Sequence, residues 1–173
     1  HSTDKLSIFK QEAQKFGIEV LPPDVNHSYP HFAVESGSIR YALAAIKNVG
    51  EQAMQVIVDE REKNGAFSDM GDFVKRVDAG SMNRRQLEHL IAAGAFDSLN
   101  SNRKQLFEST DILLAENSNA SRERDSNQNS LFGAMDATAA PAIPLRPTAD
   151  WHTIDRLQKE YEAIGFYLSD HPL

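Results

Sequence analysis

The chain has 173 residues, enough for one domain or for one domain with tails, which leaves no room for a large multidomain enzyme. Lys and Arg number 18 against 25 Asp and Glu, giving a formal net charge of −7, which excludes uniform attraction to nucleic acid or to an anionic membrane. There is no cysteine and no apolar run near the ~20 residues of a membrane span, so thiol catalysis, disulfides, thiolate zinc sites and a transmembrane helix are excluded.

The amino-terminal third predicts one helix followed by extended chain. Apolar residues recur at helical spacing up to Gly17, which can end the helix in a left-handed conformation: Leu6, Phe9, Ala13 and Phe16. The residues before Pro22 and Pro23 are expected to be extended, because proline disfavours helix in the residue that precedes it. Alternating apolar residues on both sides of Gly37 predict a small β-hairpin.

The middle of the chain has the periodicity of several short helices. Leu43 to Ile46 form a short apolar turn, residues 47–50 interrupt it, and a second helix is predicted from Glu51 to about Lys63. Shorter helices are predicted around residues 73–77, from Asn83 to Gly94, and around residues 106–114. The predicted fold class is therefore mainly α, a helix-hairpin-helix bundle with one small β-hairpin.

The composition changes from Glu116 to Asp150, where polar residues, alanine and proline predominate. Too little apolar surface is available there to offset the entropy of ordering the chain, so a long flexible linker is predicted. A last amphipathic helix is predicted to end at Gly165, with an apolar stripe of Ile154, Leu157, Tyr161 and Ile164. The apolar end at 166–168 is expected to pack on a following domain that the sequence truncates. The predicted segments are a terminal helix and link (1–26), a helix-hairpin-helix domain (27–118), the linker (119–150) and a helix leading into that next domain (151–173).

The turn before Glu51 has the layout of a helix-hairpin-helix motif. The first amides of a helix have no partner within the helix and lie at the positive end of its dipole, so they can bind a phosphate oxygen. Gly50 leaves that approach open, and Asn48 is the non-glycine residue that best tolerates a positive φ. We expect Val49 to pack back between the helices. The candidate DNA-binding residues at this turn are Lys47, Asn48, Val49, Gly50, Glu51 and Gln52.

A turn that merely joins two packed helices would show the same spacing, so a helical protein-interaction scaffold without DNA binding stays open as the alternative. The charge distribution favours the DNA reading, because residues 36–104 carry ten bases against nine acids while both flanking segments are acidic. Arg84 and Arg85 begin a predicted helix, where basic residues are poor partners for the dipole, and they are further candidates for phosphate contact. Residues 83–107 also resemble a degenerate second copy of the motif.

Four blocks of sequence, in order, resemble the bacterial replicative DNA polymerase III alpha subunit, from the end of its fingers through its helix-hairpin-helix domain to the edge of its OB domain. They are Ile18-Glu19-Val20-Leu21-Pro22-Pro23-Asp24-Val25-Asn26, Ala45-Ile46-Lys47-Asn48-Val49-Gly50-Glu51, Leu90-Ile91-Ala92-Ala93-Gly94-Ala95-Phe96-Asp97 and Gly165-Phe166-Tyr167-Leu168-Ser169-Asp170-His171-Pro172-Leu173. Asn48 and Asp170 stand where that family more often has Gly. The resemblance implies duplex DNA binding behind the polymerase active site. It is consistent with a chain that begins with His1 and not Met, from which we expect a piece of a longer protein.

The resemblance also implies a sliding-clamp-binding motif in the linker, at Gln128-Asn129-Ser130-Leu131-Phe132. Gln128 offers an amide for hydrogen bonds, and Leu131 and Phe132 are two large apolar anchors in a segment otherwise poor in them. Gln128, Ser130, Leu131 and Phe132 are the candidate clamp-binding residues. The implied partners are the duplex DNA backbone, the sliding clamp (the beta subunit) and other polymerase III holoenzyme subunits, with no membrane.

No catalytic or metal site is predicted within this chain. Polymerase chemistry requires clustered carboxylates that hold two divalent ions, and no such pair occurs in an apolar, strand-like context. Pro30 would break any helix between His27 and His31, so the two residues are interpreted as lone histidines rather than as metal ligands on one helix face. Mg²⁺ is expected only in the absent palm of a parent DNA-directed DNA polymerase, and a cytoplasmic location is expected.

Overall fold

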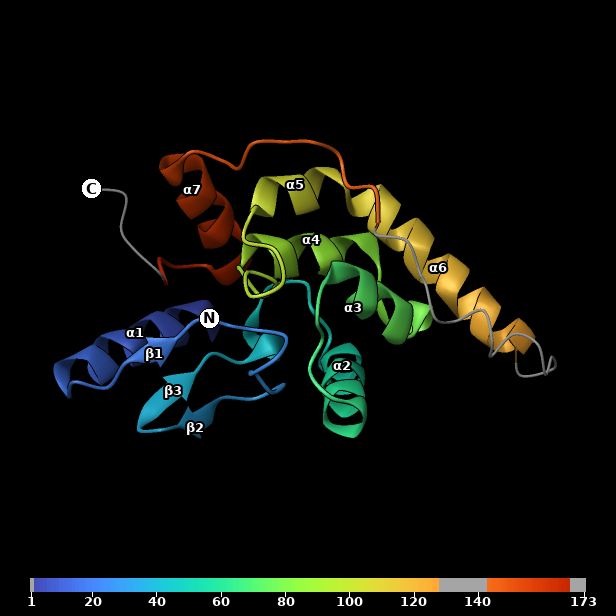
Figure 1. Ribbon diagram of the computed structural model, residues 1–173. Helices are drawn as coiled ribbons and strands as arrows, with labels where there is room; N and C mark the ends of the chain where they lie inside the picture. Colours follow the sequence, from blue (N-terminus) through green and yellow to red (C-terminus); the bar gives the residue numbers. More distant parts are fainter. Residues whose placement is uncertain (1, 128–142, 169–173) are drawn as a thin grey trace.

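The structure is a computed structural model that describes residues 2–127 and 143–168 (Figure 1). Its elements in chain order are α1 (Ser2–Lys15), β1 (Val20–Leu21), β2 (Ala33–Glu35), β3 (Ser38–Arg40), the short 3-10 helix η1 (Leu43–Ala45), α2 (Glu51–Asn64), α3 (Met70–Arg76), the 3-10 helix η2 (Ala79–Ser81), α4 (Arg84–Ala92), α5 (Arg103–Glu108), α6 (Thr110–Asn127) and α7 (Thr153–Ile164). The predicted mainly helical fold with a small β-hairpin is confirmed.

A small sheet has the strand order β1-β3-β2. β2 pairs antiparallel with β3, and β1 pairs parallel with β3 through Val20 opposite Ile39. Ser36 and Gly37 both have positive φ, 51° and 83°, as in the tight turns that suit hairpins. The sequence predicts the hairpin, but it does not reveal that the extended segment before the prolines becomes a third strand.

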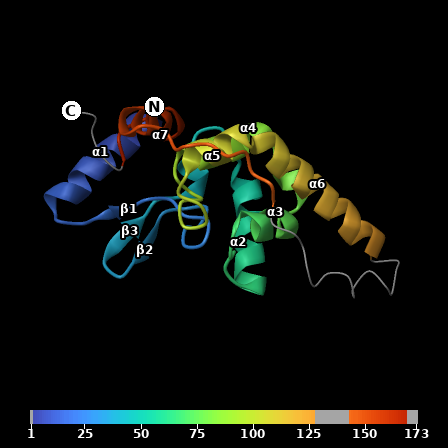
Figure 2. The ribbon, with the colours of Figure 1, turned by 45° about the horizontal axis from the view of Figure 1, so that its top comes forward.

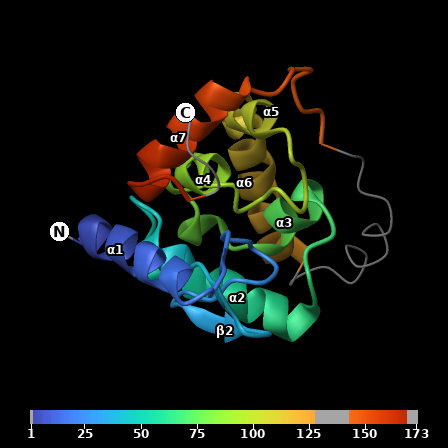
Figure 3. The same ribbon diagram turned by 90° about the vertical axis from the view of Figure 1, so that its left-hand side faces the viewer.

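One hydrophobic core joins the helices. Figure 2 shows α1 and the sheet on one side and α2, α3 and α6 on the other, and in Figure 3 α4 lies between α7 and α6. The ring of Phe73 meets those of Phe67 and Phe96 edge-on, with centroid distances of 4.9 and 4.8 Å. The largest fully buried side chains are Tyr41, Phe73, Phe96, Leu43, Ile46, Met54, Ile57, Leu87, Leu90, Ile91, Leu106 and Leu113. The division into four segments stays a prediction, although Val25 and Ile164, from the first and last of them, share this core.

Helix α6 continues to Asn127, which corrects the expectation of an irregular linker from Glu116 onward. Asn117 is 3% exposed, and its amide donates to the backbone oxygens of Val74 and Val77, each at 2.8 Å. Those oxygens lie at the carboxyl end of α3, so Asn117 satisfies acceptors that the shorter helix leaves open. Polar contacts of this kind hold α6 beside α3, and apolar periodicity cannot detect them.

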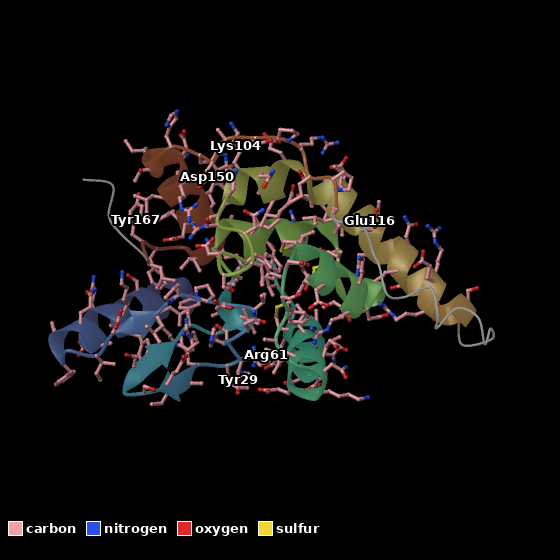
Figure 4. All side chains as sticks on the ribbon, viewed as in Figure 1. Tyr29, Arg61, Lys104, Glu116, Asp150 and Tyr167 are labelled. Carbon is pink, nitrogen blue, oxygen red and sulfur yellow. The ribbon has the colours of Figure 1, made fainter. Side chains whose placement is uncertain are left out.

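Residues 143–150 also depart from the predicted flexible linker, because they lie along α5 and the beginning of α6. Both terminal guanidinium nitrogens of Arg146 donate to the Asp111 carboxylate, at 2.6 and 2.8 Å. These hydrogen bonds hold the pKa of Asp111 well below its usual value. Farther along, the backbone N–H of Lys104 donates to Oδ1 of Asp150 at 3.1 Å (Figure 4). The segment is held by these specific polar contacts together with Ile143 and Leu145, which pack against the hydrophobic core.

Helix α7 ends at Gly165, which has a φ of 97°, as the sequence predicts. Its buried face differs from the predicted apolar stripe, because Ile154 and Tyr161 are 64% and 44% exposed. The buried residues of α7 are Leu157, Glu160, Ala163 and Ile164. The inward position of Glu160 follows from an ion pair with Arg103, whose Nη1 lies 3.1 Å from Oε1 of Glu160.

The chain after α7 packs on this same domain, which corrects the expectation that residues 166–168 await another one. Phe166 and Leu168 are each only 7% exposed, and the Phe166 ring centroid lies 6.2 Å from that of Tyr41. The Nζ atom of Lys10 donates to the backbone oxygens of Tyr167, at 2.6 Å, and Leu168, at 2.9 Å. Helix α1 thereby fixes the segment that follows α7.

Candidate nucleic-acid interface

The predicted hairpin lies between η1 and α2. Asn48 has a φ of 62°, which confirms that this residue adopts the left-handed conformation expected of it. Gly50 is the N-cap of α2, with φ −82° and ψ 140°, and no side chain caps the helix. Val49 is half-buried and packs against the core, as predicted. The two helices therefore meet through a short turn whose tip, Lys47 and Asn48, is exposed.

Side chains of α4 and the backbone of α7 hold this turn in place. The Gly50 N–H donates to Oε1 of Gln86 at 3.1 Å. Nδ2 of Asn48 lies 3.0 Å from Nε2 of His89. On the other side of the turn, the Lys47 N–H donates to the Ala163 oxygen at 2.8 Å. The hairpin is thus fixed to two other helices through three of its residues, Lys47, Asn48 and Gly50.

The tautomer of His89 follows from its two neighbours. Its Nδ1 lies 2.8 Å from the backbone oxygen of Arg85, which can only accept, so Nδ1 carries the proton. In the neutral ring Nε2 is then an acceptor for the Asn48 amide. The hydrogen-bond chain places the first turn of α4, where Arg85 lies, beside the tip of the hairpin.

The structure narrows the set of open amides that the sequence predicts. The Gly50 amide is engaged by Gln86, so it is not available to a phosphate. Within residues 2–127 and 143–168, no side-chain or backbone acceptor meets the amides of Glu51, Gln52 and Ala53. Glu51 and Gln52 are exposed, and a β-carbon added at Gly50 would meet no atom closer than 3.7 Å. The positive end of the α2 dipole is therefore accessible at Glu51 and Gln52 rather than at Gly50.

The charges around the turn are mixed. Lys47 is exposed, whereas Oε1 of Glu51 lies in the first turn of α2 and 2.6 Å from Nε2 of His31. A carboxylate in this position competes with an incoming phosphate for the helix dipole, and its pairing with a histidine reduces that competition when the ring is protonated. His31 therefore contacts Glu51, whereas His27 contacts a different carboxylate, that of Asp24, at 3.6 Å.

Arg84 and Arg85 are exposed in the first turn of α4, as the sequence predicts. Asn83 caps that helix by accepting from the Gln86 N–H at 2.8 Å. Nη1 of Arg84 lies 3.5 Å from Oε2 of Glu88, an exposed contact that leaves the guanidinium accessible. Through His89, α4 brings this basic turn next to the hairpin. Two candidate groups from separate parts of the sequence thereby share one region of the surface.

Residues 17–106 match the family described as helix-hairpin-helix motif, which includes the turn and both of its helices. The chain belongs to this helix-hairpin-helix family. The identification agrees with the geometry, because the matched region contains the two helices, the exposed tip and the helix start with open amides.

Curated relatives extend the likeness beyond the motif. The chain is 45% identical over 172 residues to the DNA polymerase III subunit alpha of Caulobacter vibrioides, covering 99% of this chain and 15% of the relative. It is 41% identical over 179 residues to the subunit of the same name from Borreliella burgdorferi, covering 100% and 15%, and 37% identical over 175 residues to that of Mycobacterium leprae, covering 98% and 14%. These relatives confirm the resemblance found in the sequence. The chain spans about 15% of their length.

The predicted second copy of the helix-hairpin-helix motif has a longer connection, since α4 ends at Ala92 and α5 begins at Arg103, and it has a closed helix start. Asn102 caps α5 by accepting from the Gln105 N–H at 3.0 Å, and Asp150 accepts from the next amide, that of Lys104. Arg103 is buried between Asp97 and Glu160. Burial alone would lower the Arg103 pKa, but hydrogen bonds and charges from those carboxylates outweigh it and raise the pKa. Protein groups therefore occupy the positions that a phosphate would need at α5.

Sequence reasoning missed Gln86 and His89. Both lie on α4, three residues apart, and both contact hairpin residues about 40 positions earlier in the chain. Gln86 is buried and His89 is half-buried, and apolar periodicity gives no signal for either contact. The clamp-binding candidates Gln128, Ser130, Leu131 and Phe132 lie outside the described residues.

The described residues add two findings on other classes of site. In residues 2–127 and 143–168 no group of three or more metal-ligating side chains comes together. No helix in that part of the chain is long and apolar enough to cross a bilayer. The expected Mg²⁺ of a palm domain stays a prediction about another part of a longer protein.

Proposed function

We propose that this chain binds duplex DNA through its phosphate backbone, as the non-catalytic part of a replicative DNA polymerase III alpha subunit. The observation that carries the proposal is a helix-hairpin-helix turn in which the Glu51 and Gln52 amides meet no acceptor among the residues that the structure describes, with Lys47 exposed beside them. Amides at a helix start bind anions, and a lysine adds a charge that strengthens the contact.

The proposed binding mode reads no bases. Backbone amides and a flexible lysine contact phosphate oxygens, which are the same for every sequence. A single hairpin contacts about two phosphates, so the logarithm of the binding constant is expected to fall with the logarithm of salt concentration with a slope of roughly −2. Such weak, uniform contact suits a protein that must hold DNA while moving along it.

Reversing the charge at the tip tests this proposal. We expect Lys47→Glu to weaken binding of a fluorescein-labelled duplex about tenfold at low salt, and to reduce the magnitude of the salt slope by about one. The reason is that one phosphate contact is lost and a repulsive charge is introduced. Fluorescence anisotropy at roughly 50 to 200 mM salt measures both quantities.

Lys63→Glu is the matched control, because Lys63 is also exposed but lies at the opposite end of α2. It makes the same change in net charge, and we expect a loss of affinity of less than about twofold, due to the general field alone. Equal losses in both variants, or no duplex binding by the parent chain, would refute the proposed site and favour a protein-interaction scaffold.

We also propose that Gln128, Ser130, Leu131 and Phe132 bind a sliding clamp. The support is the sequence itself, one glutamine amide and two adjacent large apolar side chains, together with the relatives' name, DNA polymerase III subunit alpha. The motif lies between α6, which ends at Asn127, and the anchored segment that resumes at Ile143. A clamp contact here would act together with the hairpin by raising the effective concentration of DNA at the site.

Replacing Leu131 and Phe132 together by Ala is expected to reduce capture of the chain on immobilised, purified clamp at least about tenfold, because the two apolar anchors are removed. Asn129→Ala, within the same pentapeptide, is the control and should retain capture. Both variants should bind duplex DNA like the parent. Undiminished capture of the double variant would refute the assignment of this motif.

The relatives' name suggests the setting of these contacts. We propose that the parent protein is a DNA-directed DNA polymerase that acts in the cytoplasm with other polymerase III holoenzyme subunits, and that its catalytic Mg²⁺ ions are bound outside this chain. In that setting, the hairpin and the clamp motif would keep the enzyme on the duplex during synthesis.

A further inference from the structure

We propose that Gln86 and His89 of α4 are positioning residues that set the hairpin for phosphate binding and decide which amides receive the phosphate. This inference rests on the proposed DNA-binding function. It concerns two side chains outside the hairpin, which contact no DNA in the proposed mode and act through Gly50 and Asn48.

The hairpin requires an external restraint. Asn48 has a φ of 62°, a left-handed conformation that Asn adopts more readily than other side-chain-bearing residues but less readily than Gly. Only a few residues separate η1 from α2, and Gly50, the most conformationally free of them, is the N-cap. Without contacts from elsewhere, the turn would sample other arrangements, and the amides of α2 would not keep one direction.

Helix α4 supplies that restraint from one face. Residues three apart on a helix lie next to each other, so Gln86 and His89 reach the turn together. Gln86 accepts from Gly50 at 3.1 Å, and His89 receives the Asn48 amide at 3.0 Å. The two α4 residues thus hold alternate residues of the turn, one by its backbone and one by its side chain.

Both positioning side chains are themselves fixed. Gln86 is 9% exposed, so packing restricts its side chain. The His89 ring is oriented by its Nδ1 contact with the backbone oxygen of Arg85 at 2.8 Å. A buried acceptor of this kind competes with little water, so its hydrogen bond to Gly50 persists in solution.

The contact with Gln86 also sets the register of phosphate binding. Because the Gly50 amide donates to Gln86, the first amides that can face a phosphate are those of Glu51 and Gln52. If Gln86 lost its acceptor, the Gly50 amide would be released, the turn would loosen and the pair of amides would no longer be aligned. Loss of Gln86 should therefore weaken DNA binding without removing any group that touches DNA.

Gln86→Met tests this, because methionine keeps the length of the side chain and removes the acceptor. We expect duplex affinity in low salt to fall about tenfold, measured by anisotropy at 20 °C on protein shown by circular dichroism to be folded. Gln105→Met is the matched control. Gln105 is half-buried, and its side chain forms two hydrogen bonds, with Asn100 and with the Arg146 backbone oxygen. It lies on α5 and does not contact the hairpin turn in the described part of the chain. It should bind duplex DNA within about twofold of the parent.

A double-mutant cycle distinguishes positioning from a general structural role. If Gln86 acts through the hairpin, Gln86→Met should weaken binding less than about threefold in the Lys47→Glu background, because the negative charge introduced at position 47 already weakens phosphate binding at the amides that Gln86 aligns. A structural effect on the whole domain would weaken both backgrounds equally, which would overturn the inference.

A second pair of variants keeps the test decisive if Gln86→Met does not fold. His89→Leu removes the acceptor for Asn48 and should weaken binding at least about threefold, whereas His89→Gln can still accept and should stay within about twofold. Equal affinities for these two variants would overturn the inference.

If Lys47→Glu weakens binding as expected but Gln86→Met and His89→Leu do not, only the positioning role is wrong. If the parent does not bind duplex DNA, the proposed function is wrong and this inference falls with it.

Discussion

Replacing Arg103 by methionine is expected to lower the free energy of unfolding by about 3–5 kcal/mol. The side chains of Arg103 and Glu160 are only 7% and 2% exposed, and their charged atoms lie 3.1 Å apart. Nη2 of Arg103 also lies 2.8 Å from Oδ2 of Asp97. Removing the guanidinium leaves the Glu160 carboxylate buried without this positive charge, which is far more costly than losing an exposed pair. Urea unfolding followed by circular dichroism measures the change.

Two comparisons make this result specific to the buried pair. Arg156→Met breaks ion pairs to Asp97 and Asp150 at a site where the arginine is 27% exposed, and should cost less than about 1 kcal/mol. The double variant Arg103→Met with Glu160→Met should be more stable than Arg103→Met alone, because both buried charges are removed. Equal losses for Arg103→Met and Arg156→Met would show that this pair does not anchor α7.

Replacing Arg61 by methionine is expected to lower the free energy of unfolding by about 2–4 kcal/mol. Nη1 of Arg61 donates to the backbone oxygens of Val25, at 3.0 Å, and Ser28, at 2.6 Å, and both of those residues are fully buried. The guanidinium also lies 4.9 Å from the ring centroid of Tyr29 (Figure 4). Two carbonyl groups would lose their donor inside the protein, and the link between α2 and residues 25–29 would be lost.

Lys63→Met is the control for this change, since Lys63 is exposed two residues farther along the same helix. It removes the same charge but no buried hydrogen bond, so a loss below about 0.5 kcal/mol is expected. Thermal or urea unfolding of the two variants side by side separates the effects. A similarly small decrease in the free energy of unfolding for Arg61→Met would contradict this account, because it would mean that water replaces the guanidinium as the donor to the two carbonyl groups.

The local features of this fold could be predicted because they depend on residues close together in sequence. The helical spacing around α2 and α4, the left-handed Asn48 and the helix end at Gly165 all follow from periodicity and turn chemistry. The hairpin between β2 and β3 follows from alternation around a glycine in the same way. These predictions need no knowledge of which elements meet.

The features that could not be predicted depend on polar contacts between distant residues. Gln86 and Gly50 are separated by 36 positions, and Arg103 and Glu160 by 57. Apolar periodicity predicts that a glutamate such as Glu160 is exposed to solvent, because the pattern contains no information about a charged partner on another helix. The far half of α6 was missed for the same reason, since Asn117 holds it against α3 by hydrogen bonds.

The basic residues also show that contacts between distant residues cannot be predicted from the sequence. Arg84, Arg85 and Arg103 all lie at the first turn of a helix, and the sequence gives no ground for separating them. In the structure the first two are exposed beside the hairpin, while Arg103 is buried in an ion-pair network. Burial, which tertiary packing decides, determines which of these charges can meet DNA.

Titration of duplex DNA into the ¹⁵N-labelled chain tests most directly whether the hairpin amides bind phosphate. We expect the amide resonances of Glu51 and Gln52, which meet no acceptor in the described part of the chain, to shift progressively as duplex is added at low salt. The amides of Lys104 and Gln105, which are already bonded to Asp150 and Asn102, should not move. Shifts at the start of α5 with none at the start of α2 would contradict the proposed mode of DNA binding.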